Sequence, residues 1–541
     1  MRTRSRLWEQ LLMALVVGLL ALVLLLVGCS TKTSQPASEP SGDEKAYGNI
    51  AFRTSLTRNI AGSLDPHIPE NGLFIAMTSS MFDTVLQLTP EGKIGPGLAE
   101  RWEVAPDGLT HTFFIRKGVK FHDGSDLTAA DVKFSLDRVI AGDGPDPNAV
   151  AWRSVVTSVD LKDDYTVAMR LKSPQFDLMR GFGYMAYSSS VVPKKYIEEK
   201  GVDYFSKNPI GSGPWKFVRY FAGSHLEVEA VESHWKAVPK FKNLKLVNVP
   251  EEATVVAMLK TGELDIANIS PDSAPDLKAA GLNIIDYKGG EQYVMYLFYD
   301  VEHPGQQPIG DIRVRKALSL GIDRKEMSNQ LMRGYAEPSA VWRIPSSVDY
   351  YDSSVLKADP YDPEGAKKLL TEAGYPTGFN MKLWSAGSGA TNVKDLAVAG
   401  YWRKIGVNAE VVAREESMII SLYNPRLTPE IYNTGVGKNS AAGAGYGFDM
   451  MTVFHSKKSV VHNTKNLKLD DLIDKVMATP QGPERKKLSL EALVIARDEL
   501  TFVPVLDYHT IVAIGAKVGK LTTVSGMGLN GYNAVTATHA K

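Results

Sequence analysis

The chain has 541 residues, and its 61 basic and 61 acidic side chains give a formal net charge of zero at neutral pH. This balance excludes the strongly basic class of nucleic-acid-binding proteins and provides no attraction to an anionic membrane face. The single cysteine excludes an internal disulfide and a zinc site built from cysteines.

The N-terminal segment has the layout of an export signal. Arg2, Arg4 and Arg6 precede an uncharged apolar run from Leu11 to Val27, which is short for a membrane span of about 20 residues. The only cysteine, Cys29, follows Leu-Val-Gly directly and resembles the cysteine of a bacterial lipobox. The resemblance implies that residues 1–28 are a lipoprotein signal peptide and that Cys29 carries lipid. A single-pass membrane anchor is the alternative.

Residues 29–47 are predicted to form a flexible tether. The stretch is rich in Ser, Thr, Pro, Glu and Lys and has almost no apolar side chains to bury. The remainder, about 490 residues, is too long for one hydrophobic core, so two or three lobes are expected.

The stretch from Phe121 to Arg138 is rich in polar residues, which raises the question of a metal or catalytic cluster. Its pattern instead predicts local structure. An alternating strand before it leads into a turn at residues 122–125, and Thr128 with Asp131 predicts a capping box at the start of a helix. His122 has no second histidine at ligand spacing, so we interpret it as a turn residue.

Later segments alternate between helical and extended patterns. Helices are predicted from the stripe at residues 314–322, after the cap residue Asp323, and between Asp362 and Gly374. Strands are predicted at residues 226–231, 244–249, 381–384 and 408–412. The alternation predicts an α/β chain with helix-covered sheets.

Residues 98–138, which read LAERWEVAPDGLTHTFFIRKGVKFHDGSDLTAADVKFSLDR, resemble the signature of the family 5 extracellular solute-binding proteins, the peptide- and nickel-binding components of ABC importers. The resemblance continues along almost the whole chain after the tether. Further matching landmarks are residues 63–67, 81–85, 210–215, 311–318, 321–324, 402–407 and 502–505.

The resemblance implies a bilobal fold of the periplasmic-binding-protein type, class II and large, with an extra subdomain. The lobes it implies are lobe I from residues 48–90, 208–301 and 503–541, an extra subdomain of lobe I at residues 91–207, and lobe II at residues 302–502. It also implies a monomer outside the cytoplasm, either lipid-anchored to the cell membrane or periplasmic.

The function implied is capture of a small solute, foremost a peptide, and its delivery to the permease and ATPase subunits of an ABC importer. No cofactor and no metal are expected. The sequence has no His-Glu-x-x-His, Gly-x-Ser-x-Gly or Walker A motif, so we expect a binding protein rather than an enzyme. An exported hydrolase and an adhesive lipoprotein are the alternatives from other classes.

The segment that matches the family's ligand-binding loop departs from the family pattern. Many peptide binders of this family carry a tryptophan and an aspartate that holds the ammonium group of the peptide, but residues 431–458 lack that tryptophan and contain a Gly/Ala-rich insertion. Asp449 aligns with a later aspartate of the motif. A sugar, an opine or a nickel chelate therefore remains an alternative ligand. The candidate ligand residues, carried over by position, are Trp384, Tyr432, Asn433, Tyr446 and Asp449, with Trp342 as a weaker one; a core aromatic or a helix cap is the alternative for each.

Overall fold

The structure is a computed structural model. It describes residues 49–54, 63–68, 80–89, 94–141, 150–176, 178, 189–344, 350–386, 390–415, 418–419, 429–441, 447–459, 461, 464–521 and 537–538. The predicted signal peptide, the tether, Cys29 and Tyr446 lie outside these residues. Within the described part, no helix is both long enough and apolar enough to cross a membrane.

The largest sheet contains 11 strands in the order β15-β14-β16-β12-β17-β11-β1-β10-β9-β8, and β13 pairs with β17 beside this path. The predicted strands at 226–231, 244–249, 381–384 and 408–412 fall on β9, β10, β14 and β15. The strands are β1 (Asn49–Thr54), β8 (Trp215–Phe221), β9 (His225–Ala230), β10 (Asn243–Asn248), β11 (Ile266–Asn268), β12 (Asn283–Phe298), β13 (Ala336–Pro338), β14 (Phe379–Ala386), β15 (Val407–Arg414), β16 (Thr434–Ala441) and β17 (Phe502–Ile514).

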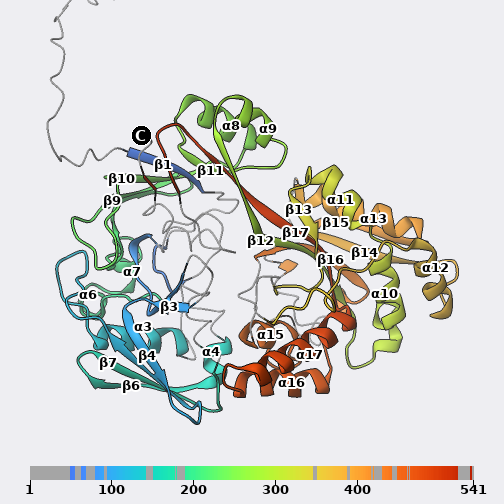
Figure 1. Ribbon diagram of the computed structural model, residues 1–541, viewed down its shortest axis with the longest axis horizontal. Coiled ribbons are helices and arrows are strands. Elements are labelled where there is room, and N and C mark those ends of the chain that lie inside the picture. The colour runs from blue at the N-terminus through green and yellow to red at the C-terminus, as the bar shows by residue number, and fades with distance from the viewer. Residues whose placement is uncertain are drawn as a thin grey trace, which may run out of the picture. The chain divides into compact units, whose positions relative to one another are not determined.

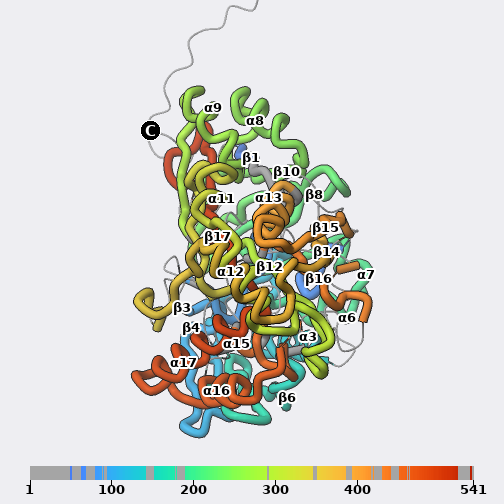
Figure 2. The backbone as a smooth tube through the Cα atoms, turned by 90° about the vertical axis from the view of Figure 1, so that its right-hand side faces the viewer, coloured from blue at the N-terminus to red at the C-terminus, as the bar shows by residue number. Residues whose placement is uncertain are grey.

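Two long strands, β12 and β17, lie in the middle of this sheet and connect its two halves (Figure 1). Residues 283–287 of β12 pair with residues 510–514 of β17, the part of β17 that also pairs with β11. Residues 291–298 pair with β16, and residues 291–296 pair with residues 502–508 of β17. The register shifts between Tyr287 and Glu291, where Gly289 and Gly290 occur. Figure 2 shows α8 (Glu252–Thr261) and α9 (Ala274–Ala279) above this region, with α16 (Leu467–Ala478) and α17 (Pro483–Glu499) below it.

A second, four-stranded sheet has the order β4-β5-β7-β6, and two of its strands, β4 and β5, come from residues 98–138. Its strands are β4 (Ala99–Val104), β5 (Thr110–Ile115), β6 (Val156–Asp163) and β7 (Thr166–Leu171); β2 (Leu86–Leu88) and β3 (Ile94–Pro96) form a separate pair. The helices of this part are α3 (Ala129–Ile140), α4 (Val150–Val155), α6 (Lys194–Lys200) and α7 (Val202–Phe205).

The polar residues of the stretch 121–138 have structural contacts, some of them local and some to distant parts of the chain. The capping box at the start of α3 is confirmed, since Asp131 Oδ2 accepts from the backbone N–H of Thr128 at 2.9 Å. His122 Nδ1 accepts from the backbone N–H of Gly211 at 3.1 Å, and Nε2 donates to the Gly213 carbonyl at 2.9 Å. Burial lowers the pKa of His122 to about 4. Both ring nitrogens are therefore used to hold one turn in place.

Helices cover both faces of the sheet around β12, and the alternation of its side chains separates two cores. Tyr293, Met295 and Leu297 belong to an apolar cluster that includes residues of α10 (Ile312–Leu320) and α13 (Ala390–Lys404). The intervening residues of β12 belong to a larger cluster with α15 (Gly447–Phe454), α16 and α17. The predicted helices in this part are confirmed: α10, α11 (Arg324–Leu331) and α12 (Pro363–Glu372), with Asp323 capping α11 and Asp362 capping α12.

The larger cluster also contains residues of the chain between β6 and residue 178. Trp152 and Leu178 are 3% and 0% exposed, and they share this cluster with Met477 of α16, which is 1% exposed. The backbone N–H of Phe176 donates to the Met477 carbonyl at 2.9 Å. In Figure 1 the cyan part of the chain meets the red helices here. We call Trp152, Phe176, Leu178 and Met477 the closing contact.

Candidate functional site

Ligands of sheets with parallel strands bind beyond the carboxyl ends of those strands. Strand β14 is parallel to both β15 and β16, so these three strands end at one edge of the sheet. The second half of β12 begins at the same edge, because Glu291 pairs with Ala441 at the end of β16. We call the polar side chains at this edge the edge cluster: Glu291, Tyr293, Ser385, Lys394, Asp395, Asn439 and Tyr508.

The edge cluster is anchored by a buried tyrosine–aspartate pair. The Tyr293 hydroxyl donates to Asp395 Oδ1, and both side chains are fully buried. Burial raises the pKa of Asp395 to about 6, while the hydrogen bond from Tyr293 acts in the opposite direction. A glycine is needed where α13 meets β16, since a Cβ on Gly437 would lie 1.7 Å from Asp395 Oδ1.

Lys394 lies next to this pair and is only 5% exposed. Its Nζ donates to Asn439 Oδ1 at 3.1 Å and lies 4.4 Å from the centroid of the Tyr508 ring. Burial lowers the pKa of Lys394 to about 8, and Glu291 and Asp395 counteract this effect. The cation is therefore stabilised by an amide and by aromatic faces as well as by the two acids.

Glu291 is the outermost member of the cluster, and its side chain is exposed. Its neighbours across the sheet are Ala441 and Tyr508. The protein around it still displaces enough water to raise its pKa, and Lys394 opposes that shift. A carboxyl group that is reached by solvent but crowded by protein is what the wall of a cleft provides.

Among the side chains that the structure describes, the candidate ligand residues do not lie together in one site. Trp384 lies near the carboxyl end of β14 but is 4% exposed and belongs to the larger apolar cluster. Tyr432 and Asn433 lie before β16, at its opposite end, where Asn433 Nδ2 donates to the Asn380 carbonyl at 3.1 Å. Asp449 belongs to α15, and its side chain is outside the described part, as is Tyr446 altogether. Trp342 is 2% exposed and packs on Phe502. A ligand role for these residues stays a prediction.

Glu291 and Lys394 were not predicted from the sequence, although α13 carries a signal for part of the edge cluster. Asp395 occupies the same helical stripe as the buried residues Val398, Ala399 and Trp402. An acid in the apolar stripe of a helix predicts a buried polar partner. Nothing comparable marks Glu291 in the sequence, because its neighbours come from β16 and β17.

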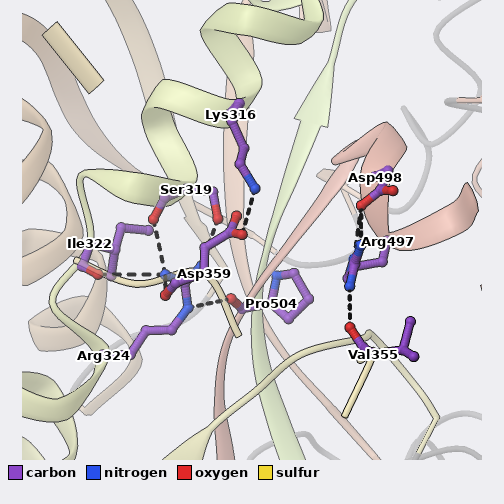
Figure 3. Close-up of polar contacts among 9 residues, drawn as sticks. All are labelled: Lys316, Ser319, Ile322, Arg324, Val355, Asp359, Arg497, Asp498 and Pro504. Carbon is purple, nitrogen blue, oxygen red and sulfur yellow. Dashed lines mark hydrogen bonds and ion pairs between the residues drawn. The ribbon is translucent and has the colours of Figure 1, made fainter. Parts of the chain in front are cut away.

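A second polar site lies under α10 and is shown in Figure 3. It is a small depression lined mainly by polar side chains. The buried guanidinium of Arg324 donates to the Ser319 and Pro504 carbonyls, each at 2.9 Å. Ion pairs of 2.6 Å join Lys316 to Asp359 and Arg497 to Asp498. These three cations already have protein partners, so the site serves the stability of this part of the chain.

Comparisons with known proteins agree on one family. Residues 93–454 match the family described as bacterial extracellular solute-binding proteins, family 5. Heme-binding protein A of Haemophilus influenzae is 26% identical over 518 residues, covering 90% of this chain and 92% of the relative. Glutathione-binding protein GsiB of Salmonella typhimurium is 30% identical over 355 residues, covering 65% of this chain and 67% of the relative.

Solved structures of this type share the fold. The periplasmic binding protein DppA from Helicobacter pylori, in complex with the peptide STSA, has a TM-score of 0.78 at 22% identity and covers 92% of this chain and 99% of its own. The binding protein AgaA from Agrobacterium tumefaciens, in complex with agropinic acid, has a TM-score of 0.78 at 23% identity and covers 91% and 99%. The predicted α/β fold of periplasmic binding proteins is thereby confirmed.

Proposed function

Because the chain belongs to the bacterial extracellular solute-binding proteins of family 5, a family of binding proteins and not of enzymes, we propose that its solute is a short peptide or a peptide-like molecule such as glutathione. The relationship to glutathione-binding proteins, 30% identical over 355 residues, carries this proposal. The DppA structure with a bound peptide supports it through the fold. A solute-binding protein of an ABC importer presents its ligand to the permease, and partner ATPases supply the energy.

We propose that the chain closes on its ligand about the two long strands. The strands β1 and β8–β11 would belong to one lobe, and β14–β16 to the other. The points of flexure would be residues 288–290 of β12, where the register shifts, and His509 of β17, which lies opposite them. These points lie inside both strands and not at the residue boundaries predicted from the sequence. The extra subdomain at residues 91–207 and a monomeric state remain part of the proposal.

The test of the ligand class is mass spectrometry of small molecules released when gently purified protein is denatured. We expect short peptides or glutathione in near-stoichiometric amount, and their re-addition should raise the melting temperature by mass action. Release of heme, a sugar, an opine or a nickel–histidine complex, without any peptide, would refute the peptide class while leaving the family intact.

Family 5 proteins are extracytoplasmic, and we propose that this chain is held at the membrane by lipid on Cys29. The support is the position of the only cysteine directly after Leu26-Val27-Gly28. Acyl chains anchor a protein by burying methylene groups, each worth roughly 0.8 kcal/mol, and stable attachment needs more than one chain.

Replacing Cys29 by serine is expected to abolish lipid attachment. The intact mass of the wild-type protein should correspond to a chain that starts at Cys29 with added acyl groups. The Cys29→Ser variant should be either an unlipidated protein released from the membrane or a precursor that retains residues 1–28. Ser30→Ala is the matched control and should behave as wild type. Identical mass and fractionation of wild type and Cys29→Ser would rule out the anchor.

A further inference from the structure

Glu291 is placed where two lobes would meet a ligand. It follows Gly289 and Gly290 directly, at the register shift that we take as a point of flexure. It is the first residue of β12 to pair with β16, and it pairs with Tyr508 of β17 on its other side. Because alternate side chains of a strand share a face, Glu291 points to the same side of the sheet as Tyr293 and the rest of the edge cluster.

The two acids of the edge cluster differ in whether their carboxylate oxygens are free to bind a ligand. Asp395 is 0% exposed and already accepts from the Tyr293 hydroxyl. The Glu291 side chain is exposed, and it has no hydrogen bond or ion pair to any residue in the described part of the chain. Lys394 is the nearby cation, but its Nζ is directed to Asn439 and to the Tyr508 ring. Glu291 is therefore the carboxylate of the cluster that is available to a ligand.

A second observation points to the same place. The Tyr508 side chain is 5% exposed, and its hydroxyl has no hydrogen-bond partner among the described residues. The charges of Glu291 and Asp395 both act on this hydroxyl and contribute to raising the pKa of Tyr508, although burial is the larger cause. A buried hydroxyl without a partner is costly, since its desolvation is not repaid by a hydrogen bond. A polar ligand group at Glu291 would supply that partner.

We propose that Glu291 accepts the free ammonium group of a peptide-like ligand and that the Tyr508 hydroxyl bonds the adjacent polar atom of that ligand. The proposal rests on the proposed function, since it names the group of the peptide that this chain recognises. An ammonium group donates to a carboxylate in a charge-assisted hydrogen bond, which is stronger than a neutral one. Strand β16, residues 434–441, contains no acid that could bind this ammonium group. A side chain on the neighbouring strand β12 would provide it instead.

The test compares binding of free and N-acetylated peptides. Wild-type protein is incubated with an equimolar mixture of tri- and tetrapeptides and with the same mixture after N-acetylation, and the retained peptides are quantified by mass spectrometry. Wild type should retain free peptides at least about tenfold more than their acetylated counterparts, because losing one partner of a desolvated charge pair weakens binding strongly. Glu291→Gln should retain both at the low level of the acetylated peptides.

Glu410→Gln, which removes an exposed acid from β15, is the matched control and should keep the wild-type preference. The melting temperature of each variant without ligand verifies folding. If wild type retains both mixtures equally, or if Glu291→Gln keeps the preference for free peptides, the assignment of Glu291 is wrong and the peptide class survives. If wild type retains neither mixture, the proposed peptide class fails together with the assignment.

Discussion

Replacing Arg138 by methionine is expected to lower the free energy of unfolding by about 3–5 kcal/mol. The Arg138 guanidinium forms two hydrogen bonds to the Asp65 carboxylate, of 2.6 and 3.2 Å, and it also donates to His67 Nδ1 at 3.1 Å. Asp65 is 0% exposed, so the variant would leave a buried carboxylate without its cation. Burial is the main reason that the pKa of His67 lies at about 4, and the Arg138 charge adds to the lowering, so this imidazole is neutral at pH 7 in the wild type.

The measurement is chemical denaturation of the purified variants followed by tryptophan fluorescence. The double variant Asp65→Asn with Arg138→Met removes both charges, and it should be clearly more stable than Arg138→Met alone. This recovery separates an uncompensated charge from a simple loss of packing. Equal stability of Arg138→Met and wild type would show that the pair contributes nothing to the attachment of α3 to residues 63–67.

Replacing Met477 by glutamate is expected to weaken ligand binding by about tenfold or more, because it places a charge in the closing contact. Met477 is 1% exposed and shares an apolar cluster with Leu178, and its carbonyl accepts from Phe176 at 2.9 Å. An unpaired buried charge costs several kcal/mol, and opening would relieve that cost by hydrating the carboxylate. If a ligand binds only the closed form, each 1.4 kcal/mol by which this form is destabilised raises the observed Kd tenfold.

Calorimetric titration with the peptides that wild type retains measures this effect. Met477→Leu preserves volume and polarity, so it should bind as wild type does. The unfolding midpoint of each variant without ligand shows whether α16 itself is damaged. A Met477→Glu variant that folds and binds with wild-type affinity would mean that residues 176–178 and α16 play no part in closure.

Much of the fold follows from short-range patterns. The capping box at Thr128, the caps at Asp323 and Asp362 and the strands around Leu226 and Leu244 are each decided within a few residues, so the sequence predicts them. The order of the large sheet is different. Pairing of β12 with β17 joins segments more than 200 residues apart, and local alternation indicates a strand without indicating its partners.

The edge cluster was less predictable than the fold, because it is also assembled from segments that are far apart in the sequence. Trp384 sits in a strand with both faces covered, since Leu383 belongs to one apolar cluster and Trp384 to the other. The alternation of one strand does not show that its second face is buried as well. Glu291 is an ordinary acid in the sequence. It becomes distinctive only when the register places it between Ala441 and Tyr508 and beside Lys394. Carrying residues over by position directed attention to residues 431–458, and the polar edge that the structure describes is shared among β12, α13, β16 and β17.

Closure on a peptide-like solute about β12 and β17 is the motion that we propose for this chain. Small-angle X-ray scattering of the purified protein, with and without a saturating mixture of free tri- and tetrapeptides, tests it most directly. Free peptides should reduce the radius of gyration of wild type, the N-acetylated mixture should do so much less, and Met477→Glu should resist the change. Scattering curves of wild type that are identical with and without peptides, under conditions where the peptides raise the melting temperature, would contradict it.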